Sequence, residues 1–366
     1  MVTEAGIDNL AGVVNSLPDE KKALFEQIFT LRTVEGRVEI PEGMRARVRD
    51  QFGSLEVVTS QETTRVRNRI TGEETLFNPL RGLRPQRSIK GSGWKYRLDS
   101  PPASDPFAQP EQSTPQDVFG RIRGKHCVTA ANIAKCEGFH GLIIFDDSNP
   151  LNFTREQVCD YIDVGWRWAE QAHAVEPRAK YFLFIWNCLW RAGASIQHGH
   201  AQVMLARERH YARIESLRKV AEEYRHGYGY SYFDDLFRVH EVVGCSSEKD
   251  NVRILASLTP FKDNEIILMA GELGPSFKNR LYELLAFFRD RLGVGSFNLA
   301  LATPPLAATG EKWCDFPVIA WLVDRGIPDS LSSDVGGMEI YASSVVSSDP
   351  LKLARRLHGY LAEEVR

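Results

Sequence analysis

The chain has 366 residues, 43% of them hydrophobic and 10% aromatic, which is enough apolar material for about two globular domains. Its 45 Lys and Arg against 48 Asp and Glu give a net charge of -3, which disfavours a nucleic-acid partner. The most apolar run, 181–190, is too short for a membrane helix, and the N-terminus lacks a signal-peptide pattern, so we expect a cytoplasmic protein without membrane contact.

The six cysteines have no C-x-x-C motif and no framework spacing, which argues against a disulfide scaffold and against a cysteine zinc site. We expect them to be reduced and mostly buried. They are Cys127, Cys136, Cys159, Cys188, Cys245 and Cys314.

Residues 1–60 predict a helical N-terminal extension, because apolar residues in 17–32 recur at helical spacing. Residues 63–87 end in LRGLRPQR, where Arg84 and its neighbouring arginines could bind phosphate or form a solvated basic turn. The loop 100–116 contains five prolines, so it cannot be regular structure, and its length leaves room for a mobile flap.

From residue 126 the pattern becomes regular and then repeats. The first repeat predicts strands at 126–132, 140–145, 180–187 and 200–205, with a helix at 154–174 opened by Thr154. After a polar helical connector, 207–243, the second repeat predicts strands at 252–258, 265–270, 297–303 and 316–323 and a helix at 277–292.

The two repeats predict an α+β fold built from a duplicated unit, with domains at 61–235 and 236–366. Sliding one repeat over the other pairs Leu142 with Ile266, Ile143 with Ile267 and Ile144 with Leu268. In that alignment HGHAQVML of the first repeat corresponds to FPVIAWLV of the second. Polar chemistry is therefore expected in the first repeat alone.

Three polar side chains, His198, His200 and Gln202, share one face of the predicted strand because residues i, i+2 and i+4 of a strand point the same way. A loop of small residues precedes them and would let backbone N–H groups approach an anion. The preceding strand ends in an amide side chain. These supporting residues are Asn187, Gly193, Ala194 and Ser195.

A neutral imidazole can attack phosphorus, and the resulting phosphoramidate can pass its phosphoryl group on, which predicts ping-pong kinetics. An H-x-H pair alone is more often structural than catalytic. Here the glycine and serine of the loop, Asn187 and Gln202 all lie within sixteen residues of one loop-to-strand unit, which favours a phosphate site.

The segment NCLWRAGASIQHGHAQ resembles the galactose-1-phosphate uridylyltransferase branch of the histidine-triad (HIT) superfamily, which also contains diadenosine tetraphosphate phosphorylases and ADP-glucose phosphorylase. It keeps every spacing of that branch's N-x(5)-G-x-S-x-x-H-x-H-x-Q pattern. NIAKCEGFH, which places Asn132 eight residues before His140, is similar to the nucleotide-binding N-x(7)-H stretch. The TGE segment with its later Arg-Pro, FDDLFRVHE with LTPFKDNEIILM, and GGMEIYASSVVSSDPLKLARRL also fit in order.

The resemblance implies two tandem HIT-like domains and a homodimer. It implies that His200 is the nucleophile that carries a nucleoside monophosphate, supported by His198 and Ser195, and that Gln202 binds a phosphoryl oxygen. Hydrolytic members have a third histidine at the Gln202 position; a glutamine cannot transfer a proton, so it favours transfer or phosphorolysis over hydrolysis. The remaining implied positions are Asn187, Gly193, Ala194, Asn132, His140 and Arg84 for the nucleotide, and Glu339 for the second substrate.

The sequence also departs from this branch. RPQRSIKGSGWKYR lacks the cysteine pair that binds zinc in the uridylyltransferases, which leaves His140 and His198 as half of a tetrahedral site, so no metal or other cofactor is expected. Phe316-Pro317-Val318 stands where their second domain has H-x-H. SSDVGGM stands before Glu339 in place of a lysine and aromatics, which argues against galactose 1-phosphate as the acceptor.

Three functions follow as hypotheses. The first is a nucleotidyltransferase or phosphorylase acting on a nucleoside diphosphate sugar or a dinucleoside polyphosphate through a nucleotidyl-His200 intermediate. The second is a nucleotide hydrolase, in which His140, His198 and His200 would hold a catalytic metal. The third is a non-catalytic nucleotide-binding protein, suggested by the eroded second repeat.

Overall fold

The structure is a computed structural model that describes residues 6–83, 98, 104–313 and 315–363. The N-terminal part contains helices, as predicted, but it also contains strands. The helix predicted in 17–32 ends at Ile28, because the β-branched alternation that begins at Phe29 pairs as a strand with residues 60–68. Its elements are η1 (Ile7–Asn9), α1 (Leu10–Asn15), α2 (Asp19–Ile28), β1 (Phe29–Arg37), α3 (Glu42–Phe52), α4 (Glu56–Thr59), β2 (Ser60–Asn68), β3 (Glu74–Phe77) and η2 (Pro79–Leu83).

The first repeat has the predicted order of strands and helix. Its long helix begins with a capping box, in which the Thr154 side chain accepts the N–H of Gln157 at 3.3 Å and the Gln157 side chain accepts the N–H of Thr154 at 2.7 Å. The predicted N-cap is confirmed. The elements from residue 104 onward are α6 (Pro110–Ser113), β4 (Cys127–Ala131), β5 (Phe139–Phe145), α7 (Arg155–Val175), β6 (Tyr181–Asn187), η3 (Trp190–Ala192) and β7 (His200–Ala206).

The connector forms two helices, and the second repeat again follows the predicted order. Its helix ends in a π-helical segment, η4, before the next strand begins. The elements are α8 (Ala212–Tyr228), α9 (Tyr232–Val242), β8 (Ser246–Lys249), β9 (Val252–Ala256), β10 (Ile266–Ala270), α10 (Pro275–Ala286), η4 (Phe287–Leu292), β11 (Phe297–Ala302), β12 (Val318–Asp324), α11 (Gly337–Tyr341), β13 (Ser344–Val346) and α12 (Pro350–Glu363).

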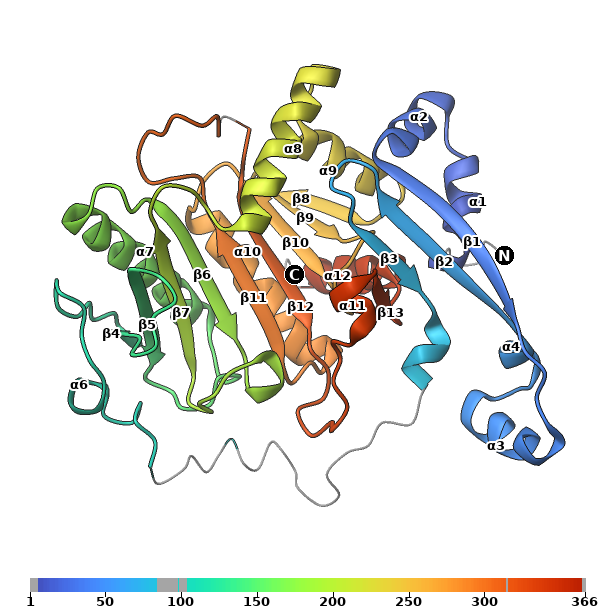
Figure 1. Cartoon of the computed structure of the whole chain (residues 1–366), viewed down its shortest axis with the longest axis horizontal. Coiled ribbons are helices and arrows are strands. Elements are labelled where there is room, and N and C mark those ends of the chain that lie inside the picture. The colour runs from blue at the N-terminus through green and yellow to red at the C-terminus, as the bar shows by residue number, and fades with distance from the viewer. Residues whose placement is uncertain (1–5, 84–97, 99–103, 314, 364–366) are drawn as a thin grey trace.

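The two repeats join in one nine-stranded antiparallel sheet, in the order β4-β5-β7-β6-β11-β12-β10-β9-β8 (Figure 1). The order within the first repeat is the reverse of the order within the second, and β6 pairs with β11 where they meet, Asn187 lying opposite Asn298. The N-terminal strands form a separate sheet, β1-β2-β3-β13. The α+β class and the duplication are confirmed, and the repeats share one sheet.

The strand pairing corrects the alignment of the repeats by one residue. Directly paired residues of antiparallel strands point to one face of the sheet. Leu142 pairs with Gln202, and the row of paired residues continues across the sheet to Trp321 and Ile267, so these side chains all point to one face. Leu142 therefore corresponds to Ile267, whereas its predicted partner Ile266 points to the other face. A slip of one residue exchanges the faces of a strand.

With this correction, the second-repeat counterparts of His200 and Gln202 are Ile319 and Trp321. The predicted counterparts, Val318 and Ala320, point to the opposite face. Both corrected counterparts are apolar, so the first repeat alone keeps polar side chains at this place on the sheet.

Helices cover the two faces of the sheet unequally. Helices α7 and α10 pack against the face opposite His200, where Phe145 of β5 stacks on Tyr161 of α7 with ring centroids 3.8 Å apart. Over the second repeat, α8, α9 and the four-stranded sheet cover the His200 face (Figure 1). None of the described helices is long and apolar enough to cross a bilayer.

Under α8, Glu265 is a buried carboxyl at the start of β10, 4% exposed. Its side chain accepts the backbone N–H of Phe261 at 3.1 Å. Burial raises the pKa of Glu265 to about 7. Between about pH 4.5 and 7 the folded state keeps the proton on Glu265, whereas the unfolded state has released it. The free energy of unfolding therefore falls as the pH rises through that range.

We predict that Glu265→Gln stabilises the protein by up to about 3 kcal/mol at pH 8, where the native carboxylate is charged and buried, and by little at pH 5. Urea unfolding at the two pH values measures the difference. The exposed Glu272→Gln is the control and should show no such pH dependence. Equal effects of Glu265→Gln at both pH values would contradict the prediction.

Candidate active site

The histidine pair lies where the loop after β6 enters β7. His198 and His200 are 6% and 7% exposed. Gly199 between them packs so closely that a Cβ there would lie 2.6 Å from Cδ2 of Phe145 and 2.8 Å from the carbonyl oxygen of Asp147. Only glycine fits so close to these atoms, so the two histidines lie directly against the end of β5.

His200 has its ring orientation set by the main chain. Its Nδ1 lies 2.8 Å from the carbonyl oxygen of His198, which can only accept, so Nδ1 carries the proton and Nε2 keeps its lone pair. Burial lowers the pKa of His200 below its ordinary 6.5, so the ring is neutral at pH 7. This is the form that a nucleophilic imidazole requires.

His198 is held at both ring nitrogens. Nε2 donates to the carbonyl oxygen of Phe145 at 2.8 Å, and Nδ1 lies 2.6 Å from Oδ2 of Asp105. The Asp105 and His198 side chains are 6% and 5% exposed, so the contact is shielded from water. Because both ring nitrogens are held, the side chain of His198 also fixes the position of its backbone carbonyl, which orients His200.

Asp105 and Phe107 are site residues that the sequence analysis missed. The ring of Phe107 packs edge-on against both histidines, with centroids 5.9 Å from His198 and 5.2 Å from His200. Both residues lie in the proline-rich loop 100–116, for which the prolines predicted no regular structure and room for a mobile flap. That prediction is wrong at Pro110–Ser113, which form the short helix α6, because a proline fits the first turn of a helix, where its missing N–H would have no partner. Asp105 is 93 positions from its partner, so spacing in the sequence offered no signal for the contact.

Gln202 is oriented by His140 on the neighbouring strand. The backbone N–H of Cys136 donates to Nδ1 of His140 at 3.2 Å, so Nε2 carries the proton and donates to Oε1 of Gln202 at 2.9 Å. The Gln202 amide nitrogen then points away from His140. Asn132 lies beside the pair, with Nδ2 at 3.1 Å from Nε2 of His140, where two donors meet because this nitrogen carries the proton. The structure brings these three predicted residues together.

Asn187 is held by the second repeat. Its Oδ1 accepts from Nδ2 of Asn298 at 2.7 Å, and the same Nδ2 donates to the carbonyl oxygen of Ala192 at 2.8 Å. Asn298 in turn accepts from Arg325, which forms an ion pair with Asp334. The second repeat thus supports the loop of the first.

The small-residue loop differs from the expected anion cradle. Gly193 has a φ of 99°, which favours glycine, and its N–H donates to Trp190. The N–H of Ala194 donates to Leu189, which itself has a φ of 68°. These two amides close the turn, so anion binding by this loop would fall to the exposed Ser195.

Two predicted positions lie elsewhere. Arg84 is outside the described residues. Glu339 is separated from His200 by β6, β11 and β12, at the start of α11 (Figure 1). There its carboxylate accepts the N–H of Gly336 at 2.8 Å and lies 3.7 Å from Nζ of Lys262. These contacts hold the pKa of Glu339 down, against the effect of burial, which would raise it.

The residues do not fit the zinc site of the resembled branch. His140 contacts Gln202 and Asn132, whereas His198 contacts Asp105 and the main chain, so they are not joined as ligands of one ion. Within the part of the chain that the structure describes, no three His, Cys, Asp or Glu side chains are grouped to hold a metal ion.

Comparison with solved structures identifies the fold. The chain is similar to an ADP-glucose phosphorylase from Arabidopsis thaliana with bound ADP-glucose, with a TM-score of 0.60 and 18% identity over 79% of this chain and 95% of that one. It is also similar to a galt-like protein from Arabidopsis thaliana (TM-score 0.56, 17% identity, 70% and 92% covered) and to a uridylyltransferase (0.56, 15%, 81% and 98%). No protein-family model and no curated protein sequence matches.

The chain therefore has the fold that these solved structures share, which agrees with the fold that the sequence resemblance predicts. At identities of 15–18% the likeness of the structures establishes the fold alone, and the chemistry of this chain has to be argued from its own residues.

We predict that Gly199→Ala destabilises the protein by about 1–3 kcal/mol, because the added methyl overlaps Phe145 and a backbone oxygen. Gly227→Ala is the matched control: it lies in α8 with no atom within 4 Å of the added Cβ, so stability should stay or rise by up to about 1 kcal/mol. Urea unfolding compares the two variants. Equal stability would contradict the packing described for the histidine strand.

Proposed function

We propose that the protein is a nucleotidyltransferase or phosphorylase that acts on a nucleoside diphosphate sugar or a dinucleoside polyphosphate through a nucleotidyl-His200 intermediate. The observation that carries the proposal is the tautomer of His200: Nδ1 donates to the carbonyl of His198, which leaves Nε2 as a neutral nucleophile. The fold, shared with nucleotide-sugar and uridylyl enzymes, supports it.

In the first half-reaction, Nε2 of His200 attacks the α-phosphorus. An N–P bond forms, and the P–O bond to the leaving group breaks with its electron pair, so a sugar phosphate or a nucleoside polyphosphate departs. The imidazole becomes positively charged, and its Nδ1–H bond to the His198 carbonyl strengthens as that charge develops. The leaving phosphate is a stable anion and needs no proton.

The leaving group needs no proton, so a hydrogen-bond donor such as the Gln202 amide suits this reaction better than a general acid. His140 occupies its oxygen, so the amide N–H groups can donate to a phosphoryl oxygen. In the second half-reaction an oxygen of inorganic phosphate or of a sugar phosphate attacks the phosphorus. The P–N bond then breaks and His200 returns to the neutral form. An anionic acceptor brings its own nucleophilic oxygen, so no general base is required.

An apolar surface beside His200 supports a nucleoside. Phe107 from the loop packs on Val128 and Ala130 of β4 and on Leu142 and Ile144 of β5, and Ile144 lies directly opposite His200 in the strand pairing. These side chains are all buried, because Phe107 covers the other four. Apolar side chains next to a few polar groups suit a nucleobase, and we place the base where the Phe107 ring now lies, with Asn132 and His140 toward the sugar.

Glu339 belongs to the proposal only through a second copy of the chain. It lies across β6, β11 and β12 from His200, so within one chain it is too far round the sheet to share a substrate with the histidine. A role in binding the second substrate would therefore require a homodimer in which one protomer's α11 approaches its partner's histidines.

The intermediate can be trapped with nucleoside diphosphate sugars and diadenosine tetraphosphate labelled at the α-phosphorus. We expect an acid-labile, alkali-stable protein adduct near one equivalent per chain. It should vanish in His200→Ala and persist in His126→Ala, which removes a half-exposed histidine away from the site. A stoichiometric adduct in His200→Ala, or no labelling by the whole panel, would overturn the proposal.

The pH dependence follows from the lowered pKa of His200. Because the neutral ring is the nucleophile, the rate of adduct formation should be flat from pH 6.5 to 8.5 and fall only below the lowered pKa, under 6.5. Quenched-flow measurement of the labelled adduct gives this profile. An acid limb centred above pH 7 would mean that His200 is charged in the resting protein and would contradict the assignment.

A further inference from the structure

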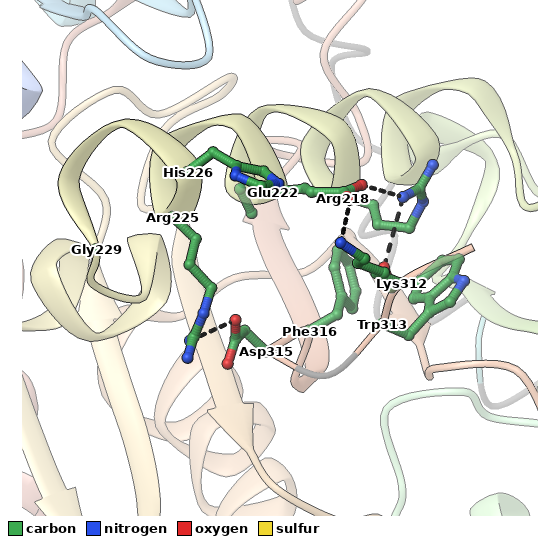
Figure 2. Close-up of a pocket in the computed structure, with 10 residues that line it drawn as sticks. Arg218, Glu222, Arg225, His226, Gly229, Lys312, Trp313, Asp315 and Phe316 are labelled. Carbon is green, nitrogen blue, oxygen red and sulfur yellow. Dashed lines mark hydrogen bonds and ion pairs between the residues drawn. The ribbon is translucent and has the colours of Figure 1, made fainter.

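A cavity of about 460 Å³ lies between α8 and the loop 303–317, and its charges select no ligand. Figure 2 shows Arg225 of its rim in contact with Asp315, at 2.6 Å. The other rim cation, Lys312, lies 3.8 Å from Glu222. These pairs neutralise the rim, so the cavity favours neither an anion nor a cation.

Three donor atoms of a different kind meet on the first repeat, near the edge of the nine-stranded sheet. The loop between β4 and β5 brings Sγ of Cys136 to 3.4 Å from Nδ1 of His140 and to 3.6 Å from Sδ of Met204. His140 and Met204 are directly paired across β5 and β7, so their side chains lie on one face of the sheet (Figure 1). A thiol, an imidazole and a thioether therefore lie together.

The spacing of these atoms is close to that of the ligands of one metal ion. Bonds of about 2.0 Å to nitrogen and about 2.3 Å to sulfur, at tetrahedral or trigonal angles, separate a nitrogen from a sulfur ligand by roughly 3.5–3.7 Å and two sulfur ligands by roughly 3.8–4.0 Å. The observed 3.4 and 3.6 Å are slightly shorter, so a small outward movement of the Cys136 thiol makes room for an ion. Cys136 is exposed, whereas His140 and Met204 are buried, so the ion can enter at the thiol.

His140 turns an unprotonated nitrogen toward the two sulfur atoms. Its Nε2 carries the proton and donates to Oε1 of Gln202, so Nδ1 keeps its lone pair. The backbone N–H of Cys136 donates to that lone pair at 3.2 Å, a long hydrogen bond between neutral groups that a metal ion has to displace. Ligation at Nδ1 leaves the bond to Gln202 in place.

The donor set selects a soft monovalent ion. Thiolate and thioether sulfur favour Cu(I), whereas zinc takes thiolate, imidazole and carboxylate ligands. We propose that Cys136, His140 and Met204 bind one Cu(I) ion. The metal–sulfur bond forms as the thiol proton of Cys136 leaves to solvent, and the copper stays in the same oxidation state. The site does not depend on the function proposed for His200.

The proposal is tested without oxygen by titrating the full chain into the coloured complex of Cu(I) with bicinchoninate. We expect the chain to withdraw about one Cu(I), seen as loss of the colour of the complex. Cys136→Ser, a change at an exposed residue, should abolish this transfer. Met204→Leu keeps the volume and removes the sulfur, so it should weaken binding roughly tenfold.

Two matched controls accompany these variants. Cys159→Ser replaces a half-buried cysteine of α7, and Met44→Leu replaces an exposed methionine of α3; both should leave the transfer unchanged. No transfer to the unaltered chain, or undiminished transfer to Cys136→Ser, would overturn the proposal.

The nitrogen ligand is identified by nitrogen-15 NMR of the protein labelled at histidine, with Ag(I) as a soft ion of the same charge. One equivalent should shift the Nδ1 signal of His140, assigned by comparison with His140→Ala, and leave Nε2 protonated. One equivalent of Zn(II) should leave that signal in place, because a thioether is not among the ligands of zinc. An unchanged Nδ1 signal with Ag(I), or an equal response to Zn(II), would contradict the assigned site.

Discussion

The site depends on one hydrogen bond, from Nδ1 of His200 to the carbonyl oxygen of His198 two residues before it. It forms because both residues lie where an extended loop enters β7 and because Gly199 lets the chain pack against β5. A main-chain carbonyl can only accept, so the bond fixes the proton of the neutral ring on Nδ1. Burial keeps the ring neutral, and the contacts of His198 with Asp105 and Phe145 hold the carbonyl in place.

The two repeats of the fold have different roles. The first repeat carries the polar side chains, while the second has apolar residues, Ile319 and Trp321, at the corresponding positions and is covered there by α8. The second repeat still serves the first, since Asn298 holds both Asn187 and the turn at Ala192. Loss of polar residues from one copy is therefore compatible with its retention as a support.

Much of the fold and part of the site could be predicted because their signals are local. Strand periodicity, the Thr154 cap and the N-x(5)-G-x-S-x-x-H-x-H-x-Q spacing all lie within single elements or adjacent ones. Asp105 and Phe107 could not be found, because their contacts with the histidines span about ninety residues and come from a loop without periodicity. The alignment of the repeats slipped by one residue since apolar runs match equally well in either register until pairing assigns the faces.

The central claim, that His200 rests as a neutral imidazole with its nucleophilic nitrogen free, can be tested before any substrate is known. Nitrogen-15 NMR of the protein labelled at histidine, with the His200 signals assigned by comparison with His200→Ala, reports the protonation of each ring nitrogen at pH 7. The account predicts a protonated Nδ1 and an unprotonated Nε2 for His200. A protonated Nε2, in either the other tautomer or the imidazolium, would contradict it.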